Sequence, residues 1–155
     1  MNRSAVFSSC RKYRYSLTRS WGLEKNFILF IGLNPSIADE NNDDPTISRC
    51  ISFAKDWGYD GLIMVNLFAF RASLPSNLKK EKLPIGVDNN RHILKNLKTS
   101  QLIVIAWGND GQLLKRDREV LGLIKNPMCL KINKTKQPAH PLYQKKSQQL
   151  IKYSY

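Results

Sequence analysis

The chain has little cysteine, and the spacing of that cysteine excludes several classes of protein. Cys10, Cys50 and Cys129 lie far apart and include no C-x-x-C pair. They therefore indicate neither a disulfide framework nor a zinc site, and three thiolates cannot supply the four ligands of an ordinary iron–sulfur cluster. Apolar runs of the ~20 residues needed to cross a membrane are also missing, as is the apolar core of a signal peptide. We therefore expect a cytoplasmic protein that has no metal site and does not contact a membrane.

Acidic residues are also scarce. Twelve Asp and Glu stand against 25 Lys and Arg, so the formal net charge is +13. The acidic residues gather around positions 39–44, which leaves the rest of the chain more basic still. This excess of positive charge favours a polyanionic partner, with nucleic acid as the first candidate. A solvated basic surface without such a partner is the alternative.

The order of apolar segments predicts an α/β fold in a single domain over residues 1–155. Apolar runs of strand length lie at 27–33, 62–65 and 101–106, and a weaker one lies at 128–132. Apolar residues recur at helical spacing over 45–57, from 88 onward and over 109–124, with Asp44 placed to cap the first helix. Because strands alternate with helices, we predict a three-layer α/β/α sandwich with a central four-stranded, mostly parallel sheet.

The segment 1–26 is polar and basic, and it interleaves Arg14 and Arg19 with Tyr13, Tyr15 and Trp21. Such a mixture suits base stacking and phosphate contact. An edge hairpin packed by the same aromatic residues explains the pattern equally well.

Polar or small residues follow each predicted strand. Asn34 comes after the first strand, Asn66 ends the second, Trp107 and Gly108 close the third, and His140 lies on a late loop. In an open α/β sheet, ligands bind outside the carboxyl ends of the strands. We therefore expect these residues to surround one cleft.

As a set, these patches resemble the DUF1643 family of bacterial and phage proteins. The resemblance is carried by Arg14-Tyr15, Gly32 to Ser36, Asp43 to Thr46, Arg49-Cys50, Asn66-Leu67-Phe68, Trp107-Gly108 and His140 to Tyr143. The order of the motifs is also similar to the uracil-DNA glycosylase superfamily. Gly32-Leu33-Asn34-Pro35-Ser36 resembles its G-I-N-P-G motif, Ile103 to Gly108 resembles a strand of the type L-L-W-G, and His140-Pro141-Leu142 resembles its H-P-S-P-L motif with one residue missing.

The second resemblance implies a glycosylase-like fold and a monofunctional DNA glycosylase that needs no cofactor. Its substrate would be a flipped-out uracil-like or modified pyrimidine, such as a hydroxymethylated or glucosylated base. Breaking the N-glycosidic bond places positive charge on the sugar and negative charge on the departing base, so an aligned water and fixed donors are required. By the resemblance, Asn34 positions the water and Asn66 reads the base edge. His140, on a late loop, is the best candidate for a hydrogen-bond donor to the base.

Several further residues have two interpretations. Asp43 or Asp44 could assist Asn34 as a general base, although Asp44 also fits as a helix cap. Asn34 could instead be an ordinary turn residue, and Asn66 could hydrogen-bond the backbone of the loop that follows its strand. Gly32, Leu33, Phe68, Trp107 and Gly108 are candidates for the base pocket, whereas Phe68 and Trp107 could equally pack in the core.

Phosphate contacts are assigned to basic residues near the expected cleft: Arg14, Arg19, Arg71, Lys134, Lys136, Lys145 and Lys146. Each of these could instead be a solvated surface residue. We expect a monomer that binds DNA. The alternatives are a catalytically silent nucleic-acid-binding module and a hydrolase of free nucleosides or nucleotides.

Overall fold

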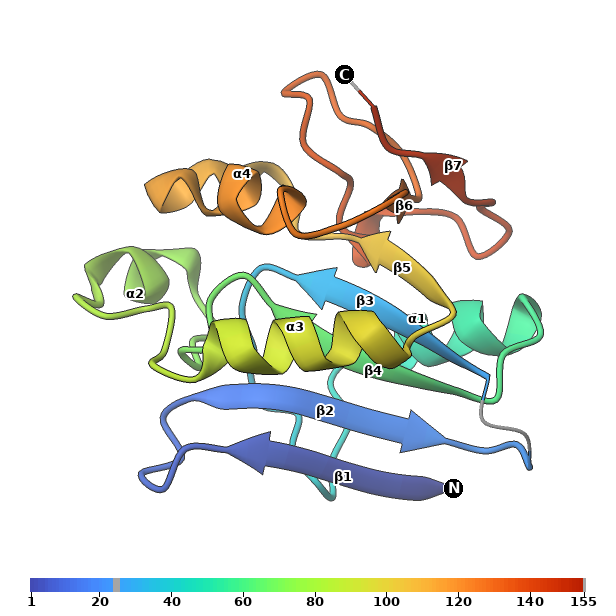
Figure 1. The fold of residues 1–155 in the computed structure, drawn as a ribbon, viewed down its shortest axis with the longest axis horizontal. Coiled ribbons are helices and arrows are strands. Elements are labelled where there is room, and N and C mark those ends of the chain that lie inside the picture. Colours follow the sequence, from blue (N-terminus) through green and yellow to red (C-terminus); the bar gives the residue numbers. More distant parts are fainter. Residues whose placement is uncertain (24–25, 155) are drawn as a thin grey trace.

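The computed structural model describes residues 1–23 and 26–154 (Figure 1). Positions 24 and 25 of the basic N-terminal segment lie outside the described residues. The strands are β1 (Asn2–Phe7), β2 (Arg14–Ser20), β3 (Phe27–Gly32), β4 (Gly61–Asn66), β5 (Leu102–Ile105), β6 (Met128–Cys129) and β7 (Ile151–Lys152). The helices are α1 (Pro45–Asp56), α2 (Pro75–Lys80), α3 (Asn89–Thr99) and α4 (Arg116–Leu121), with 3-10 helices η1 (Asn109–Lys115) and η2 (Pro141–Tyr143).

The described strands form one seven-stranded mixed sheet in the order β1-β2-β4-β3-β5-β6-β7. The four strands expected from the sequence are its parallel centre, β4-β3-β5-β6. The expected count of four is wrong, because the antiparallel hairpin β1–β2 joins at β4 and the short strand β7 joins at β6. The hairpin has no continuous apolar run, since β1 is an edge strand and β2 carries the buried Arg14 and Arg19.

Helices cover both faces of the sheet, with α3 in front of it and α1 behind it in Figure 1. Along β3, Ile28 and Phe30 belong to the core cluster that contains Cys50 of α1. The intervening Leu29 and Ile31 belong to the second cluster, which contains residues of α2, α3 and α4. This alternation follows from the two-residue period of a strand, and it buries the central sheet on both sides.

Two helix expectations needed correction. The helix expected over 109–124 is split into η1 and α4, because Leu114 and Lys115 adopt positive φ angles of 54° and 56°. The short helix α2 lies between the predicted strand at 62–65 and the helix predicted from 88 onward, where no helix is expected. By contrast, α1 lies within the expected range 45–57, and α3 begins directly after Asp88 as expected. Among the described residues, no helix has the length and apolar character required to span a membrane.

The topology opens a crevice at the carboxyl end of β3. The chain leaves β3 toward α1 on one face of the sheet, whereas it leaves β4 and β5 toward helices on the other face. Because β3 lies between β4 and β5, connections diverge on both of its sides. Such divergence is where open α/β sheets bind their ligands.

Candidate functional site

A cavity of about 610 Å³ lies at this position, outside the carboxyl ends of β3, β4 and β5. This volume is typical of small-molecule sites, which span roughly 300–1,000 Å³. Asn34, Asn66 and His140 all line it, which confirms the convergence expected from the strand order. The other expected site residues that line it are Gly32, Leu33, Asp44, Trp107, Gly108 and Arg14.

Asn34 presents an acceptor to the cavity. Its Nδ2 donates to the backbone oxygens of Pro35 at 3.0 Å and Ala72 at 2.8 Å. The amide hydrogens are thereby engaged, so Oδ1 is the group left to interact with a ligand or a water. The structural and functional interpretations of Asn34 are compatible, because the contacts that brace the loop also fix the direction of Oδ1.

Asn66 presents a donor. It ends β4 with a side chain that is 3% exposed, and its Nδ2 has no hydrogen-bond acceptor among the described residues. A buried donor without a partner costs about 1–3 kcal/mol, which an acceptor on a bound ligand would recover. Gly32 leaves room for this amide, since a Cβ at Gly32 would lie 2.8 Å from Asn66 Oδ1.

His140 presents a second donor. Its Nδ1 accepts a hydrogen bond of 3.2 Å from the backbone nitrogen of Leu142 at the start of η2. Burial lowers the pKa of His140 from 6.5, against a smaller opposing effect of the Asp44 carboxylate. The ring is therefore neutral at neutral pH, and its proton lies on Nε2, where it can be donated.

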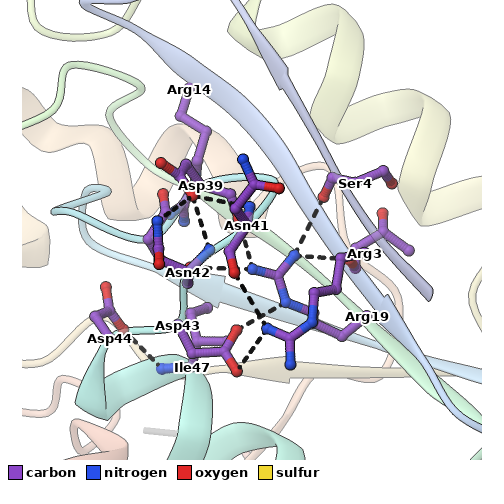
Figure 2. Close-up of polar contacts among 12 residues, drawn as sticks. Arg3, Ser4, Arg14, Arg19, Asp39, Asn41, Asn42, Asp43, Asp44 and Ile47 are labelled. Atoms are coloured by element: carbon purple, nitrogen blue, oxygen red, sulfur yellow. Dashed lines mark hydrogen bonds and ion pairs between the residues drawn. The ribbon is translucent and has the colours of Figure 1, made fainter. Parts of the chain in front are cut away.

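The two aspartates have different surroundings (Figure 2). Asp44 Oδ1 accepts from the backbone nitrogen of Ile47 at 2.8 Å, which confirms the cap of α1, and Asp44 also lines the cavity. Asp43 instead pairs with Arg19 at 2.8 Å and with Arg3 at 3.4 Å, and it is not among the described residues that line the cavity. The expectation that Asp43 acts on the water is therefore wrong, because its carboxylate is committed to the two guanidinium groups.

Arg19 is not available for phosphate contact, which corrects a second expectation. Its side chain is fully buried and bonds the carboxylate of Asp43 (Figure 2). The same guanidinium donates to backbone oxygens of Ser4, Thr18, Asp39 and Asn42. These contacts attach the acidic loop to β2, so both the basic and the acidic residue have a structural role.

Arg14 also lies away from the outer surface, at 2% exposure, but it lines the cavity. Its Nη1 donates to the backbone oxygen of Ala38 at 3.0 Å. Burial lowers the pKa of Arg14 to about 10, so the group stays charged at neutral pH. A phosphate contact by Arg14 stays a prediction, and only a group that enters the cavity could make it.

The aromatic candidates pack in the core. Phe68 is fully buried in the cluster on the α3 side and is not among the described cavity residues, so its proposed stacking on a base is wrong. Trp107 is 1% exposed, and its Nε1 donates to Gln137 Oε1 at 2.8 Å. Trp107 therefore forms part of the cavity wall and is fixed by this bond. Gly108 has a φ of +76°, a conformation that favours glycine.

The remaining basic candidates divide into two groups. Lys134, Lys136, Lys145 and Lys146 are exposed, and they adjoin Asn133 and Gln144, which line the cavity. Arg71 is partly buried, because its guanidinium lies 4.9 Å from the ring of Phe7 and its Nε donates to the backbone oxygen of Ser36 at 3.3 Å. The four lysines are thus the freer of the expected phosphate contacts.

Two cavity features were not foreseen. Leu142 and Tyr143 line the cavity while being 36% and 83% exposed, so apolar and aromatic surface lies at its mouth. Arg14 was expected to contact phosphate near the cleft, and the tertiary structure places it in the wall of the cavity itself. Among the described residues, no group of three or more His, Cys, Asp or Glu could bind a metal ion.

Comparison with known proteins identifies the family. The model of a family described as a protein of unknown function, DUF1643, matches residues 14–142. The chain belongs to the DUF1643 family. The match covers every strand of the sheet except β1 and β7, and it includes the residues that form the cavity from Arg14 to Leu142. No curated protein and no solved structure matched this DUF1643 protein.

Proposed function

We propose that this DUF1643 protein is a monofunctional DNA glycosylase with a fold like that of uracil-DNA glycosylase. It hydrolyses the N-glycosidic bond of a flipped-out uracil-like or modified pyrimidine and leaves an abasic site. The observation that carries the proposal is the meeting of Asn34, Asn66 and His140 in one cavity, with one acceptor and two donors available. The order of the motifs, which is similar to that superfamily, supports it.

The residues match the two halves of the reaction. Oδ1 of Asn34 accepts a hydrogen bond from the attacking water and orients it, but an amide is too weak a base to deprotonate it strongly. Departure of the base must therefore lead, and water attacks the cationic sugar that results. Asn66 Nδ2 and the neutral His140 Nε2 donate to the base as negative charge develops on it, which lowers the barrier.

Access to a base in DNA requires that the nucleotide leave the stack, at a cost of a few kcal/mol. The net charge of +13 and the exposed lysines beside the cavity segments supply the phosphate contacts that offset this cost. The protein acts as a cytoplasmic monomer and needs no cofactor in this proposal.

An abasic-site assay tests the proposal. Oligonucleotides, single-stranded and duplex, carry uracil, mismatched thymine, hydroxymethylpyrimidines or glucosylated bases, and alkali converts each abasic site into a strand break. The variants are Asn34→Ala and the matched control Asn77→Ala, which changes an exposed residue of α2 outside the cavity. We expect strand breaks with the wild type and with the control. With Asn34→Ala, we expect the rate of base excision to be lower by about 10²-fold or more.

Two outcomes contradict the proposed activity, and a third contradicts the role of Asn34. Tight binding of all the oligonucleotides without any strand break indicates a silent nucleic-acid-binding module. Cleavage of free nucleosides or nucleotides, with none in DNA, indicates a hydrolase of small substrates. Equal activity of Asn34→Ala and the wild type would show that the water is positioned elsewhere.

A further inference from the structure

Arg14 is a buried cation whose hydrogen-bonding capacity is largely unused. Its side chain is 2% exposed and lines the cavity. Among the described residues, only Nη1 has an acceptor, the backbone oxygen of Ala38, and the buried Nε has none. No described carboxylate lies within 4.0 Å of the Arg14 guanidinium, since none of the ion pairs includes it.

In the other two fully buried arginines, every guanidinium nitrogen has at least one acceptor. Arg19 bonds a carboxylate and four backbone oxygens. Arg116 donates to the backbone oxygen of Leu67 and to the side chains of Glu119 and Asn90. Burying an unpaired charge is costly, so the lack of partners at Arg14 needs a reason. The cavity that Arg14 lines, and the other two do not, supplies one.

A β-bulge directs Arg14 to this position. In the β1–β2 ladder, Val6 pairs with Ser16 and Phe7 pairs with Arg14, so Tyr15 is an extra residue. The ring of Tyr15 stacks on His92 of α3 with centroids 5.0 Å apart, whereas Arg14 reaches Ala38. Bulges re-aim side chains in this way and are common beside active sites.

The two fully buried side-chain nitrogens at the cavity that lack an acceptor in the described part of the chain, Arg14 Nε and Asn66 Nδ2, are both donors. Asn66 Nδ2 lies in the same cavity as Arg14, and it also lacks an acceptor among the described residues. Asp44 offsets part of the cost of burying Arg14, because its carboxylate raises the pKa that burial lowers. A ligand that completes this arrangement must bring acceptor atoms, and a guanidinium binds carboxylate and phosphate oxygens most strongly.

We propose that Arg14 forms an anion subsite inside the cavity, which receives a carboxylate or phosphate group of the nucleotide substrate. The group is carried either on the base, as a substituent, or on the sugar, as its phosphate. This inference deepens the proposed function and rests on it. It makes Arg14 a determinant of which nucleotide is accepted, and this role differs from a phosphate contact on the outer surface.

NMR titration of the whole protein tests the subsite with three probes. Deoxyuridine has no anionic group, deoxyuridine 5′-monophosphate has one on the sugar, and 5-carboxy-2′-deoxyuridine has one on the base. We expect at least one anionic probe to bind about tenfold to a hundredfold more tightly than deoxyuridine. The preferred probe identifies the source of the anion. Arg14→Met should remove the preference, whereas Arg118→Met, at an exposed position of α4 outside the cavity, should keep it.

Equal binding of all three probes to the wild type would overturn the inference, as would a preference that survives in Arg14→Met. If Arg14→Met does not fold, the wild type still decides. The Nε–H signal of Arg14, assigned through its covalent connection to the Arg14 side chain, must shift with the anionic probe and stay unchanged with deoxyuridine. The two proposals fail separately: abasic sites without an anion preference reject only the subsite, and an anion preference without abasic sites rejects only the glycosylase.

Discussion

At Asp44, the contribution of a side chain to the stability of the fold can be separated most clearly from its contribution to base excision. Its Oδ1 caps α1 through the backbone nitrogen of Ile47, while the residue also lines the cavity. Asp44→Ala removes both the capping oxygen and the charge, whereas Asp44→Asn removes only the charge. Asparagine caps helices about as well as aspartate, so the difference between the two variants isolates the cap.

The size of this difference follows from the structure. Asp44 is 9% exposed, and the Ile47 nitrogen that it bonds belongs to a fully packed residue of the core. We therefore expect Asp44→Ala to have a free energy of unfolding about 1 kcal/mol lower than Asp44→Asn, within the roughly 0.5–2 kcal/mol range for the loss of a cap. For a chain of this size, that corresponds to a melting temperature about 2–4 °C lower.

Urea denaturation gives the stabilities, and the abasic-site assay gives the activities. Because one oxygen of Asp44 is committed to the cap, we expect Asp44→Asn to keep base excision within about tenfold of the wild type. Equal stabilities of the two variants would refute the capping argument. A loss of about 10²-fold or more in Asp44→Asn would instead identify Asp44 as a general base.

Three further predictions concern other parts of the site. Gly32→Ala places a Cβ 2.8 Å from Asn66 Oδ1. It should therefore lower the rate of base excision by about tenfold or more, and lower the free energy of unfolding by about 1–3 kcal/mol. Burial lowers the pKa of His140, so the free energy of unfolding that this residue contributes falls as the pH drops below about 6.5. His140→Gln should therefore show a shallower dependence of stability on pH, measured by urea denaturation. Changing the four exposed lysines to glutamine should reduce the slope of log affinity for DNA against log salt by about 0.9 for each phosphate that the protein no longer neutralises, and an unchanged slope would place the DNA elsewhere. The lysines are Lys134, Lys136, Lys145 and Lys146.

The central part of the fold could be predicted because its signals are local. Continuous apolar runs identified β3, β4 and β5, and Asp44 followed by a proline identified the start of α1. The hairpin β1–β2 was only one of two interpretations of the N-terminal segment. Its residues resemble a nucleic-acid-binding segment because β2 buries Arg14, Tyr15 and Arg19, residue types that are equally typical of an exposed basic and aromatic surface.

The cavity could be predicted in outline for a different reason. Parallel strands end at one edge of the sheet, so residues that follow them in the sequence meet in space. This rule placed Asn34 and Asn66 together, and the late loop brought His140 to them. The rule says nothing about which way each side chain faces, and the expectations for Asp43, Arg19 and Phe68 were wrong at that level.

The sequence by itself determined the parallel centre of the sheet, the cap of α1 and the segments that meet at the cavity, because periodicity, turn residues and strand order are properties of neighbouring positions. Only the tertiary structure decided which buried charges form ion pairs within the protein and which remain free to bind a ligand. Arg14 and Arg19 lie on the same strand, but a carboxylate reaches Arg19 from the acidic loop, while a bulge turns Arg14 into the cavity without one. Pairing of buried charges depends on contacts between distant segments, so no local pattern distinguishes the two arginines.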